Sequence, residues 1–284
     1  MITELHEKSF RRCLPLLEHV SALEAKAVLQ GVNRGRVFVD DSQKPRSGFV
    51  WLGNHDGFLF FGDAANEVFL AELQSFLLET IYPNMVELGL QWFEAISSQA
   101  NWEPVLKNVF NNSPHWQQHV YLNDNFQNTH EQLGGQLSGK YELLQLSNET
   151  DNYFSSLLNY STVKKTIEQS WYSLNDFYAK GIGYCIVFER QVISYCYSSF
   201  VSDHYYIINI WTDEKFRRQS LALETAQAFI RSCQEKQGHP YWDCTDSNRA
   251  SNQLAQKLGL KIQQSYTGYE YKVPTKVMNS TILT

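Results

Sequence analysis

A polar, glycine-containing stretch divides the sequence into two parts in which strands and helices are expected in similar order. The stretch, NDNFQNTHEQLGGQLSGK, covers residues 123–140 and has the composition of a linker. On each side of it, successive strand-like runs lead into a long helix, a strand, a shorter helix and a final strand. This repeated order predicts two α/β (or α+β) domains of related topology.

Hydrophobic periodicity gives the expected elements of each part. Before the linker we expect strands at 34–40, 47–53 and 56–62, a helix at 66–82, a strand at 92–97, a helix at 102–110 and a strand at 115–122. After it we expect a strand at 141–146, helices at 151–160 and 171–181, strands at 183–190, 191–200 and 204–211, a long helix from Arg217, a strand at 239–244, a helix at 248–259 and strands at 261–266 and 269–273. We place the smaller first domain at 1–125, the linker at 126–137 and the second domain at 138–284.

Composition excludes several classes of protein. No apolar run approaches the roughly 18 residues of a membrane span, and the N-terminus, MITELHEKSFRRC, lacks the apolar segment of a signal peptide. We therefore expect a cytoplasmic protein with no membrane partner. The five cysteines are odd in number and never spaced C-x-x-C, which favours small buried side chains over disulfides or a zinc site.

Charge is unevenly divided along the chain. Residues 1–135 carry 9 Lys and Arg against 16 Asp and Glu, whereas residues 136–284 carry 15 against 14. The acidic first part disfavours nucleic acid as a partner. His115 and His119 have the H-x-x-x-H spacing of helical metal ligands, but the run PHWQQHVYL is typical of a strand, so no metal site is expected.

The junction between the strand YYIINIW and the helix LALETAQAFIRSCQEKQ carries unusual residues, RRQSLA (217–222). The first N–H groups of a helix have no intrahelical partner and add to its positive potential, so such an end binds phosphate. Small residues at Ser220 and Ala222 allow close approach, and Arg217 and Arg218 oppose the dipole unless an anion or a carboxylate is near. A capped helix with a solvated basic first turn is the alternative.

The order strand, R-x-x-S-x-A, long helix resembles the pyrophosphate loop of the GNAT superfamily of N-acetyltransferases, with Ser220 at the usual Gly position. Downstream, NRASNQLAQKLGL resembles the last helix of that superfamily through Asn248, Ser251, Leu254 and the run from Lys257 to Gly259. The resemblance is strongest over residues 205–262. It implies a C-terminal GNAT fold, a mixed central sheet flanked by helices, preceded by a degenerate N-terminal unit.

The resemblance also implies a cofactor site for acetyl-CoA. In that superfamily the cofactor lies where two parallel strands splay apart, which assigns the pantetheine arm to backbone groups of Ile210, Trp211 and Thr212. Asn248 and Ser251 would contact the pantetheine or its neighbouring water, although Asn248 also fits a helix cap. The pyrophosphate would be held by the N–H groups of Arg217, Arg218, Gln219, Ser220, Leu221 and Ala222.

The catalytic residues stay open. The tyrosine that many relatives use as an acid is replaced by Ala255, and the strand HYYIINIW lacks the glutamate that serves as base in histone-type relatives. Asp243, at the end of an expected strand, and Tyr269, on a late strand, are the two substitutes we consider. For Asp243 the alternatives are pairing with an arginine or capping a helix.

The sequence thus predicts an N-acetyltransferase that moves an acetyl group from acetyl-CoA to a small-molecule or peptide amine by direct attack in a ternary complex. The alternative is a catalytically inactive acyl-CoA-binding or protein-interaction module with the same fold. The acidic residues in DAANE disfavour pyrophosphate binding at the first long helix, so we expect the N-terminal unit to be non-catalytic. A homo-oligomer is compatible with either function.

Overall fold

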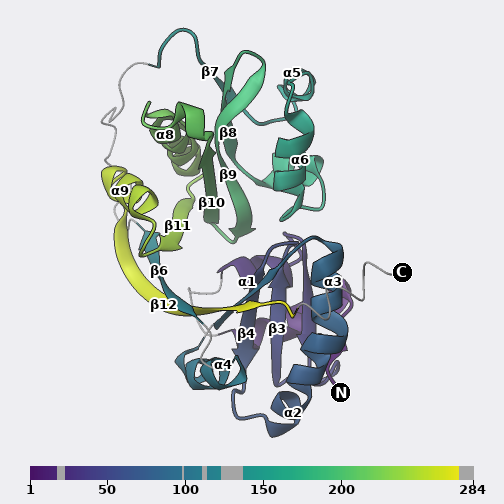
Figure 1. Cartoon of the computed structure of the whole chain (residues 1–284). Helices are drawn as coiled ribbons and strands as arrows, with labels where there is room; N and C mark the ends of the chain where they lie inside the picture. The colour runs from purple at the N-terminus through teal and green to yellow at the C-terminus, as the bar shows by residue number, and fades with distance from the viewer. Residues whose placement is uncertain (18–22, 98, 111–113, 123–136, 275–284) are drawn as a thin grey trace. The chain divides into compact units, whose positions relative to one another are not determined.

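The computed structural model forms two compact units (Figure 1). Unit 1 consists of Met1–Gln117 and Tyr266–Thr284, and unit 2 of Gln118–Ser265. These limits differ from the expected borders at 125 and 138, because the end of the chain belongs to unit 1. The expected linker lies, except for Leu137, outside the described residues. The structure describes residues 1–17, 23–97, 99–110, 114–122 and 137–274.

Unit 1 is a mixed sheet in the order β1-β2-β3-β4-β5-β12. Strands β4 and β5 are parallel, and the other neighbouring pairs are antiparallel. Its core is rich in aromatic rings, among which Phe58 and Phe93 stack with centroids 4.0 Å apart. The elements are β1 (Thr3–Glu4), η1 (Glu7–Leu16), α1 (Leu23–Leu29), β2 (Gly35–Val39), β3 (Ser47–Leu52), β4 (Gly57–Gly62), α2 (Glu67–Phe76), η3 (Leu77–Ile81), α3 (Tyr82–Glu87), β5 (Trp92–Ser97), η4 (Ala100–Trp102), α4 (Glu103–Val109) and β12 (Lys261–Lys272).

The long helix expected at 66–82 is interrupted by a π-helical segment, Leu77–Ile81, and continues to Glu87. Pro83 explains the interruption, because proline has no N–H and its ring crowds the carbonyl four residues earlier. Three further segments, β1, η1 and α1, were not predicted from the sequence. The other strands and helices expected in this unit are present.

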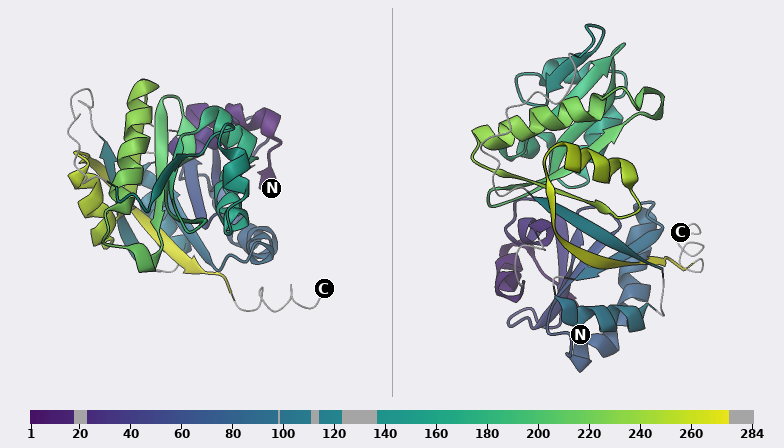
Figure 2. Two further views of the ribbon diagram at one scale, coloured as in Figure 1. Left: turned by 90° about the horizontal axis from the view of Figure 1, so that it is seen from above. Right: turned by 90° about the vertical axis from the view of Figure 1, so that its left-hand side faces the viewer.

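Unit 2 is a mixed sheet in the order β6-β11-β10-β9-β8-β7. Helix α8 covers one face, where Leu223 and Phe229 pack with Ile208. Helices α5 to α7 cover the opposite face, and Trp171 Nε1 donates to the Ser198 carbonyl at 2.9 Å (Figure 2). The elements are β6 (His115–Leu122), β7 (Glu142–Gln145), α5 (Asp151–Ser155), α6 (Tyr160–Glu168), α7 (Leu174–Lys180), β8 (Gly183–Phe188), β9 (Gln191–Ser202), β10 (Tyr205–Thr212), η6 (Glu214–Phe216), α8 (Leu221–Glu235), β11 (His239–Thr245) and α9 (Arg249–Lys257).

Each unit receives its last strand from the other part of the sequence. Strand β6 lies before the expected linker yet pairs antiparallel with β11, Val120 opposite Asp243. Strand β12 ends the second part yet pairs antiparallel with β5, Tyr269 opposite Ala95. The two strands expected at 261–266 and 269–273 are one continuous strand, β12. This exchange explains why the compact units and the sequence-based domains differ.

Two expectations from composition can be compared with the structure. All five cysteines are free and buried, as predicted. Burial raises the pKa of Cys185 to about 12 and that of Cys196 well above its usual range, so both thiols stay protonated. Across the described segments, every helix is too short or too polar to span a lipid bilayer.

Candidate functional site

The central feature of unit 2 is a pair of parallel strands that separate. Strands β10 and β11 pair only from Tyr205 with His239 to Ile207 with Tyr241. Beyond this point β10 continues along β9 to Thr212, and β11 pairs with β6 on its other side. A register shift in the β10–β9 pairing between Ile207 and Ile208 coincides with the separation. The strands therefore leave a gap at their carboxyl ends, where α/β folds commonly bind ligands.

The pairing register decides which backbone groups face this gap. The N–H of Asp213 donates to the carbonyl of Ile193 at 2.9 Å, so the alternation of an antiparallel ladder directs the Trp211 backbone to β9. The N–H and C=O of Ile210 and Thr212 then point away from β9, toward the gap. Of the three residues expected to offer backbone groups, Ile210 and Thr212 do so, whereas Trp211 offers its side chain.

The loop that enters α8 has an unusual backbone. Arg218 and Ser220 have φ values of 62° and 61°, in the left-handed region that side chains with a Cβ adopt at a cost. Ser220 is the N-cap residue but makes no side-chain cap bond. The first N–H that bonds within the helix is that of Glu224, to the Ser220 carbonyl at 3.1 Å. The N–H groups of Leu221, Ala222 and Leu223 are thus left for an external acceptor.

The start of α2 in unit 1 provides a contrast. There Asn66 caps the helix by accepting from the Phe69 N–H at 3.3 Å, and its amide donates to Asp40 Oδ2 at 2.8 Å. Asp63 accepts from the Ala65 N–H at 2.9 Å. An internal amide and an internal carboxylate therefore occupy the positive end of α2, while the corresponding end of α8 is open.

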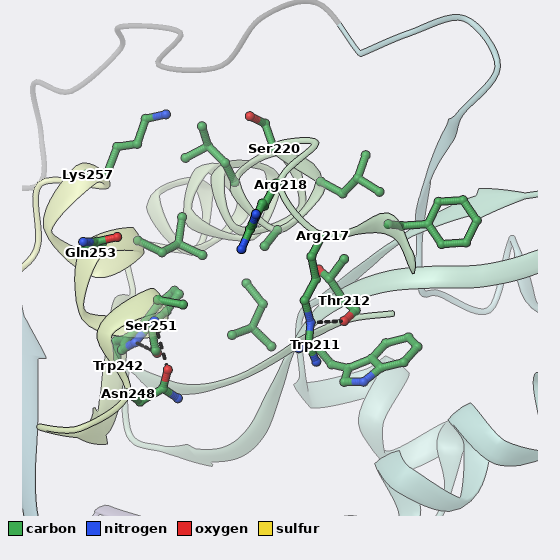
Figure 3. Close-up of a pocket in the computed structure, with 17 residues that line it drawn as sticks. Trp211, Thr212, Arg217, Arg218, Ser220, Trp242, Asn248, Ser251, Gln253 and Lys257 are labelled. Carbon is green, nitrogen blue, oxygen red and sulfur yellow. Dashed lines mark hydrogen bonds between the residues drawn. The ribbon is translucent and has the colours of Figure 1, made fainter. Parts of the chain in front are cut away.

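The two arginines of the loop are held differently. Arg217 Nε donates to the Thr212 carbonyl at 3.3 Å, and its guanidinium forms an exposed ion pair with Glu214 at 3.4 Å. Within the described part of the chain, Arg218 has no ion-pair partner, and its side chain extends into the pocket (Figure 3). Arg218 is therefore the cation that is available to an anion bound at the start of α8.

These parts enclose a pocket of about 720 Å³. The gap between the strands, the start of α8 and one side of α9 form its walls (Figure 3). Among the described residues that line it, three are cations and none is acidic, so their potential favours an anionic ligand. The lining residues are Ile210, Trp211, Thr212, Phe216, Arg217, Arg218, Ser220, Leu221, Ala222, Leu223, Trp242, Asn248, Ala250, Ser251, Gln253, Leu254 and Lys257.

The wall formed by α9 is fixed by hydrogen bonds. Asn248 caps the helix, since its Oδ1 accepts from the Ser251 N–H at 3.2 Å. The Ser251 hydroxyl accepts from Trp242 Nε1 on β11 at 3.0 Å. Asn252 accepts from the Tyr121 hydroxyl on β6 and donates to the Thr245 carbonyl at 2.9 Å. Both the cap and the pocket position of Asn248 that the sequence suggested are present together.

Three sequence-predicted residues lie outside the pocket lining. The Gln219 side chain points elsewhere, because its Oε1 accepts from the Tyr141 hydroxyl at 2.6 Å. Asp243 Oδ2 accepts from Gln118 Nε2 at 2.7 Å. Tyr269 belongs to unit 1, where it is buried in the aromatic core and burial raises its pKa. Tyr269, a candidate catalytic residue on a late strand of the expected second domain, lies in unit 1 because β12 pairs with β5.

The pocket offers few groups that could move a proton. The part of its lining that the structure describes contains no Asp, Glu, His, Cys or Tyr side chain. Ala255, at the position where relatives carry a tyrosine, is fully buried in the core of unit 2. His115 and His119 lie on strand β6, and no cluster of potential metal ligands occurs among the described residues. The arrangement supports binding of an anionic ligand and backbone stabilisation of charge, with proton transfer left to small molecules.

The sequence analysis missed several lining residues, among them Phe216, Trp242, Gln253 and Lys257. The spacing of α9 could have identified Lys257, because positions 251, 254 and 257 recur on one side of a helix that already carried a predicted site residue. Trp242 could not be placed in this way, since its contact with Ser251 depends on how β11 packs against α9.

Comparisons with known proteins agree with this geometry. A family model described as GNAT acetyltransferase matches residues 15–269. An uncharacterised N-acetyltransferase of Bacillus subtilis (strain 168), YdfB, is 27% identical over 249 residues, which cover 86% of this chain and 88% of the relative.

Solved structures share the fold. A GCN5-related N-acetyltransferase-like protein from Streptococcus suis 89/1591 superposes with a TM-score of 0.67 at 20% identity, covering 93% of this chain and 98% of the other. A tandem GNAT protein from the clavulanic acid biosynthesis pathway superposes with a TM-score of 0.56 at 8% identity, covering 96% and 99%. Both the mixed sheets and the relation to tandem GNAT proteins agree with the predicted fold class.

Proposed function

The chain belongs to the GNAT acetyltransferase family, and on this premise we propose that it transfers an acetyl group from acetyl-CoA to an amine by direct attack in a ternary complex. The proposal rests on three features that occur in one pocket: the gap between β10 and β11, the open start of α8, and the side chain of Arg218, which forms no ion pair with the described residues. Each suits a different part of the donor.

The diphosphate of the donor would lie at the start of α8. There the N–H groups of Leu221, Ala222 and Leu223 and the guanidinium of Arg218 would bind its oxygens. The pantetheine arm would enter the gap, where the backbone of Ile210 and Thr212 faces it as the edge of a strand. Asn248 would contact the arm through its amide nitrogen, since its oxygen is used by the cap.

In this mechanism, acetyl transfer needs no catalytic side chain from the described lining of the pocket. A neutral amine nitrogen attacks the carbonyl carbon of the thioester, a C–N bond forms, and the C–S bond breaks as the CoA thiolate leaves. The N–H of Ile210 would donate to the oxyanion that develops on the carbonyl oxygen. Because the described lining holds no carboxylate, imidazole, thiol or phenol, we propose that water takes the proton of the amine and supplies one to the thiolate.

The N-terminal part would have no donor site of its own. The start of α2 is occupied by Asn66 and Asp63, and a carboxylate there repels a diphosphate. We propose a structural role for unit 1, so that one donor binds per chain.

Calorimetric titration of acetyl-CoA tests donor binding. Arg218→Glu places a carboxylate in the pocket and should abolish measurable binding. Arg231→Glu is the matched control, because this exposed residue lies on the same helix and does not line the pocket. Failure of the unaltered protein to bind acetyl-CoA, or equal binding by both variants, contradicts the proposal.

A second function is favoured by the absence of acidic and basic catalysts from the pocket: a module that binds acyl-CoA without turning it over. Release of CoA thiol in the presence of a panel of amines separates the two. Amine-dependent release supports transfer. Tight binding with no release above the rate without amine supports the binding module.

A further inference from the structure

We propose that Lys257 binds the 3′-phosphate on the ribose of the donor, so that the site selects phosphorylated CoA thioesters over donors that lack this group. The inference rests on the proposed function, because it assigns a second anionic group of the same donor. It concerns selection of the donor, and Lys257 is not assigned a part in acetyl transfer.

The first argument is the position of Lys257. It is the last residue of α9 and lies about two and a half helical turns beyond Asn248, the cap residue at the end of the pocket near the strand gap. At a rise of about 1.5 Å per residue, its Cα lies roughly 9 Å farther along the axis than that of Ser251. Figure 3 shows its side chain on the α9 wall, at the end of the pocket away from Asn248 and Trp211.

Positive charges lie on two separate walls of the pocket. The open start of α8 and Arg218 together provide for one diphosphate at the loop. Lys257 comes from a different wall, and no ion pair joins it to any residue that the structure describes. CoA carries two distinct anionic groups, the diphosphate and the ribose 3′-phosphate. A pocket with cations on two walls therefore fits both groups.

The third argument is the chemistry of the side chain. Lys257 and its neighbour on the same helical face, Gln253, are both exposed. A lysine is a compact charge on a flexible stem, which suits a terminal phosphate in contact with solvent better than a bidentate clamp does. The contribution should be modest and sensitive to salt, as for other exposed charge pairs.

The test compares CoA with dephospho-CoA, which lacks only the 3′-phosphate. The unaltered protein should bind CoA about three- to tenfold more tightly at low salt. Lys257→Gln should bring the two affinities close together by weakening CoA alone, and Lys257→Arg should restore most of the difference. Lys236→Gln is the control, because it removes the same charge beyond the far end of α8.

Each outcome of the comparison between CoA and dephospho-CoA either supports or overturns the inference. Equal binding of the two ligands by the unaltered protein overturns it, as does a Lys257→Gln variant that weakens both ligands alike. In these cases CoA still binds, so the proposed donor survives. If neither ligand binds, the proposed function and this inference fail together. Circular dichroism of each variant confirms that a lost preference does not reflect unfolding of α9.

Discussion

The indole N–H of Trp242 donates to the hydroxyl oxygen of Ser251 at 3.0 Å, and this bond joins the strand that borders the gap to the helix that forms the opposite wall. Trp242 is almost fully buried, so its N–H has no ready replacement partner. The Ser251 hydroxyl also lies within reach of the Cys244 thiol, whose pKa is raised by burial and lowered in part by a hydrogen bond from Ser251.

The Trp242–Ser251 pair should be coupled in stability. Ser251→Ala leaves a buried N–H unpaired, and Trp242→Phe removes the N–H together with part of the ring; each should lower the free energy of unfolding by about 1–3 kcal/mol. In the double variant the losses should be less than additive by about 0.5–1.5 kcal/mol. Urea titrations of the four proteins measure the coupling. Strict additivity would mean that the bond contributes nothing.

Ser220→Gly should stabilise the protein by about 0.5–1 kcal/mol, because glycine adopts a φ of 61° without the steric cost that a Cβ imposes. Ser220→Ala keeps the Cβ and removes only a hydroxyl that does not cap the helix, so it should not stabilise. Thermal melts of both variants separate the two causes. An equal rise for alanine and glycine would show that the hydroxyl, not the backbone, carries the cost.

Asn248 should have two separable roles, in capping α9 and in binding the donor. Asn248→Ala removes the cap oxygen and should lower the free energy of unfolding by about 1 kcal/mol. Asn248→Asp keeps an oxygen that can accept from the Ser251 N–H, but it replaces the amide donor with a negative charge. The aspartate variant should therefore be as stable as the original protein yet bind acetyl-CoA more weakly. Unaltered binding by the aspartate variant would leave Asn248 as a cap alone.

Glu94 should make unit 1 less stable as the pH rises. Burial, followed by the nearby charges of Asp56 and Glu270, raises its pKa to about 6. The folded state thus favours the protonated form, and this contribution is complete below the unfolded pKa of about 4.5 and lost as the pH rises through about 6. Glu94→Gln should therefore stabilise the protein by up to about 2 kcal/mol at pH 8 and hardly at all at pH 4.

Paired urea titrations of the Glu94→Gln variant and the original protein at the two pH values measure this difference. Their comparison cancels other titrating groups, including His55, whose pKa burial lowers to about 4. Glu79→Gln, at an exposed position of unit 1, is the control. A gain that is the same at both pH values would assign the effect to something other than the charge of Glu94.

Many of the helices and strands follow from local sequence patterns, whereas the pairing of the strands does not. The runs 47–53, 56–62 and 204–211 alternate or cluster apolar residues strongly enough to be identified as strands, and β3, β4 and β10 lie there. Which strand pairs with β11 depends on contacts between distant residues, so nothing local shows that β6 does. For the same reason, local patterns do not show that Tyr269 lies on a strand that pairs with β5 of unit 1.

Some features of the candidate site could likewise be predicted from the sequence, and others could not. Ser220 and Ala222 could be predicted to lie at the start of α8 because the loop is contiguous in sequence. The bonds that occupy Arg217, Gln219 and Asp243 could not, since each partner is set by packing. Arg218, rather than the motif position Arg217, is therefore the loop arginine that no carboxylate pairs with in the part of the chain that the structure describes.

The exchange of β6 and β12 also bears on how the protein is made. During synthesis the partner of β5 emerges only with residues 269–272, after the rest of unit 2 has left the ribosome. Until then, the nascent first unit exposes an unpaired strand edge, the kind of edge that invites pairing with other chains. A chain that terminates before residue 269 would keep that edge, so synthesis of β12 is the step after which the first unit can complete its sheet.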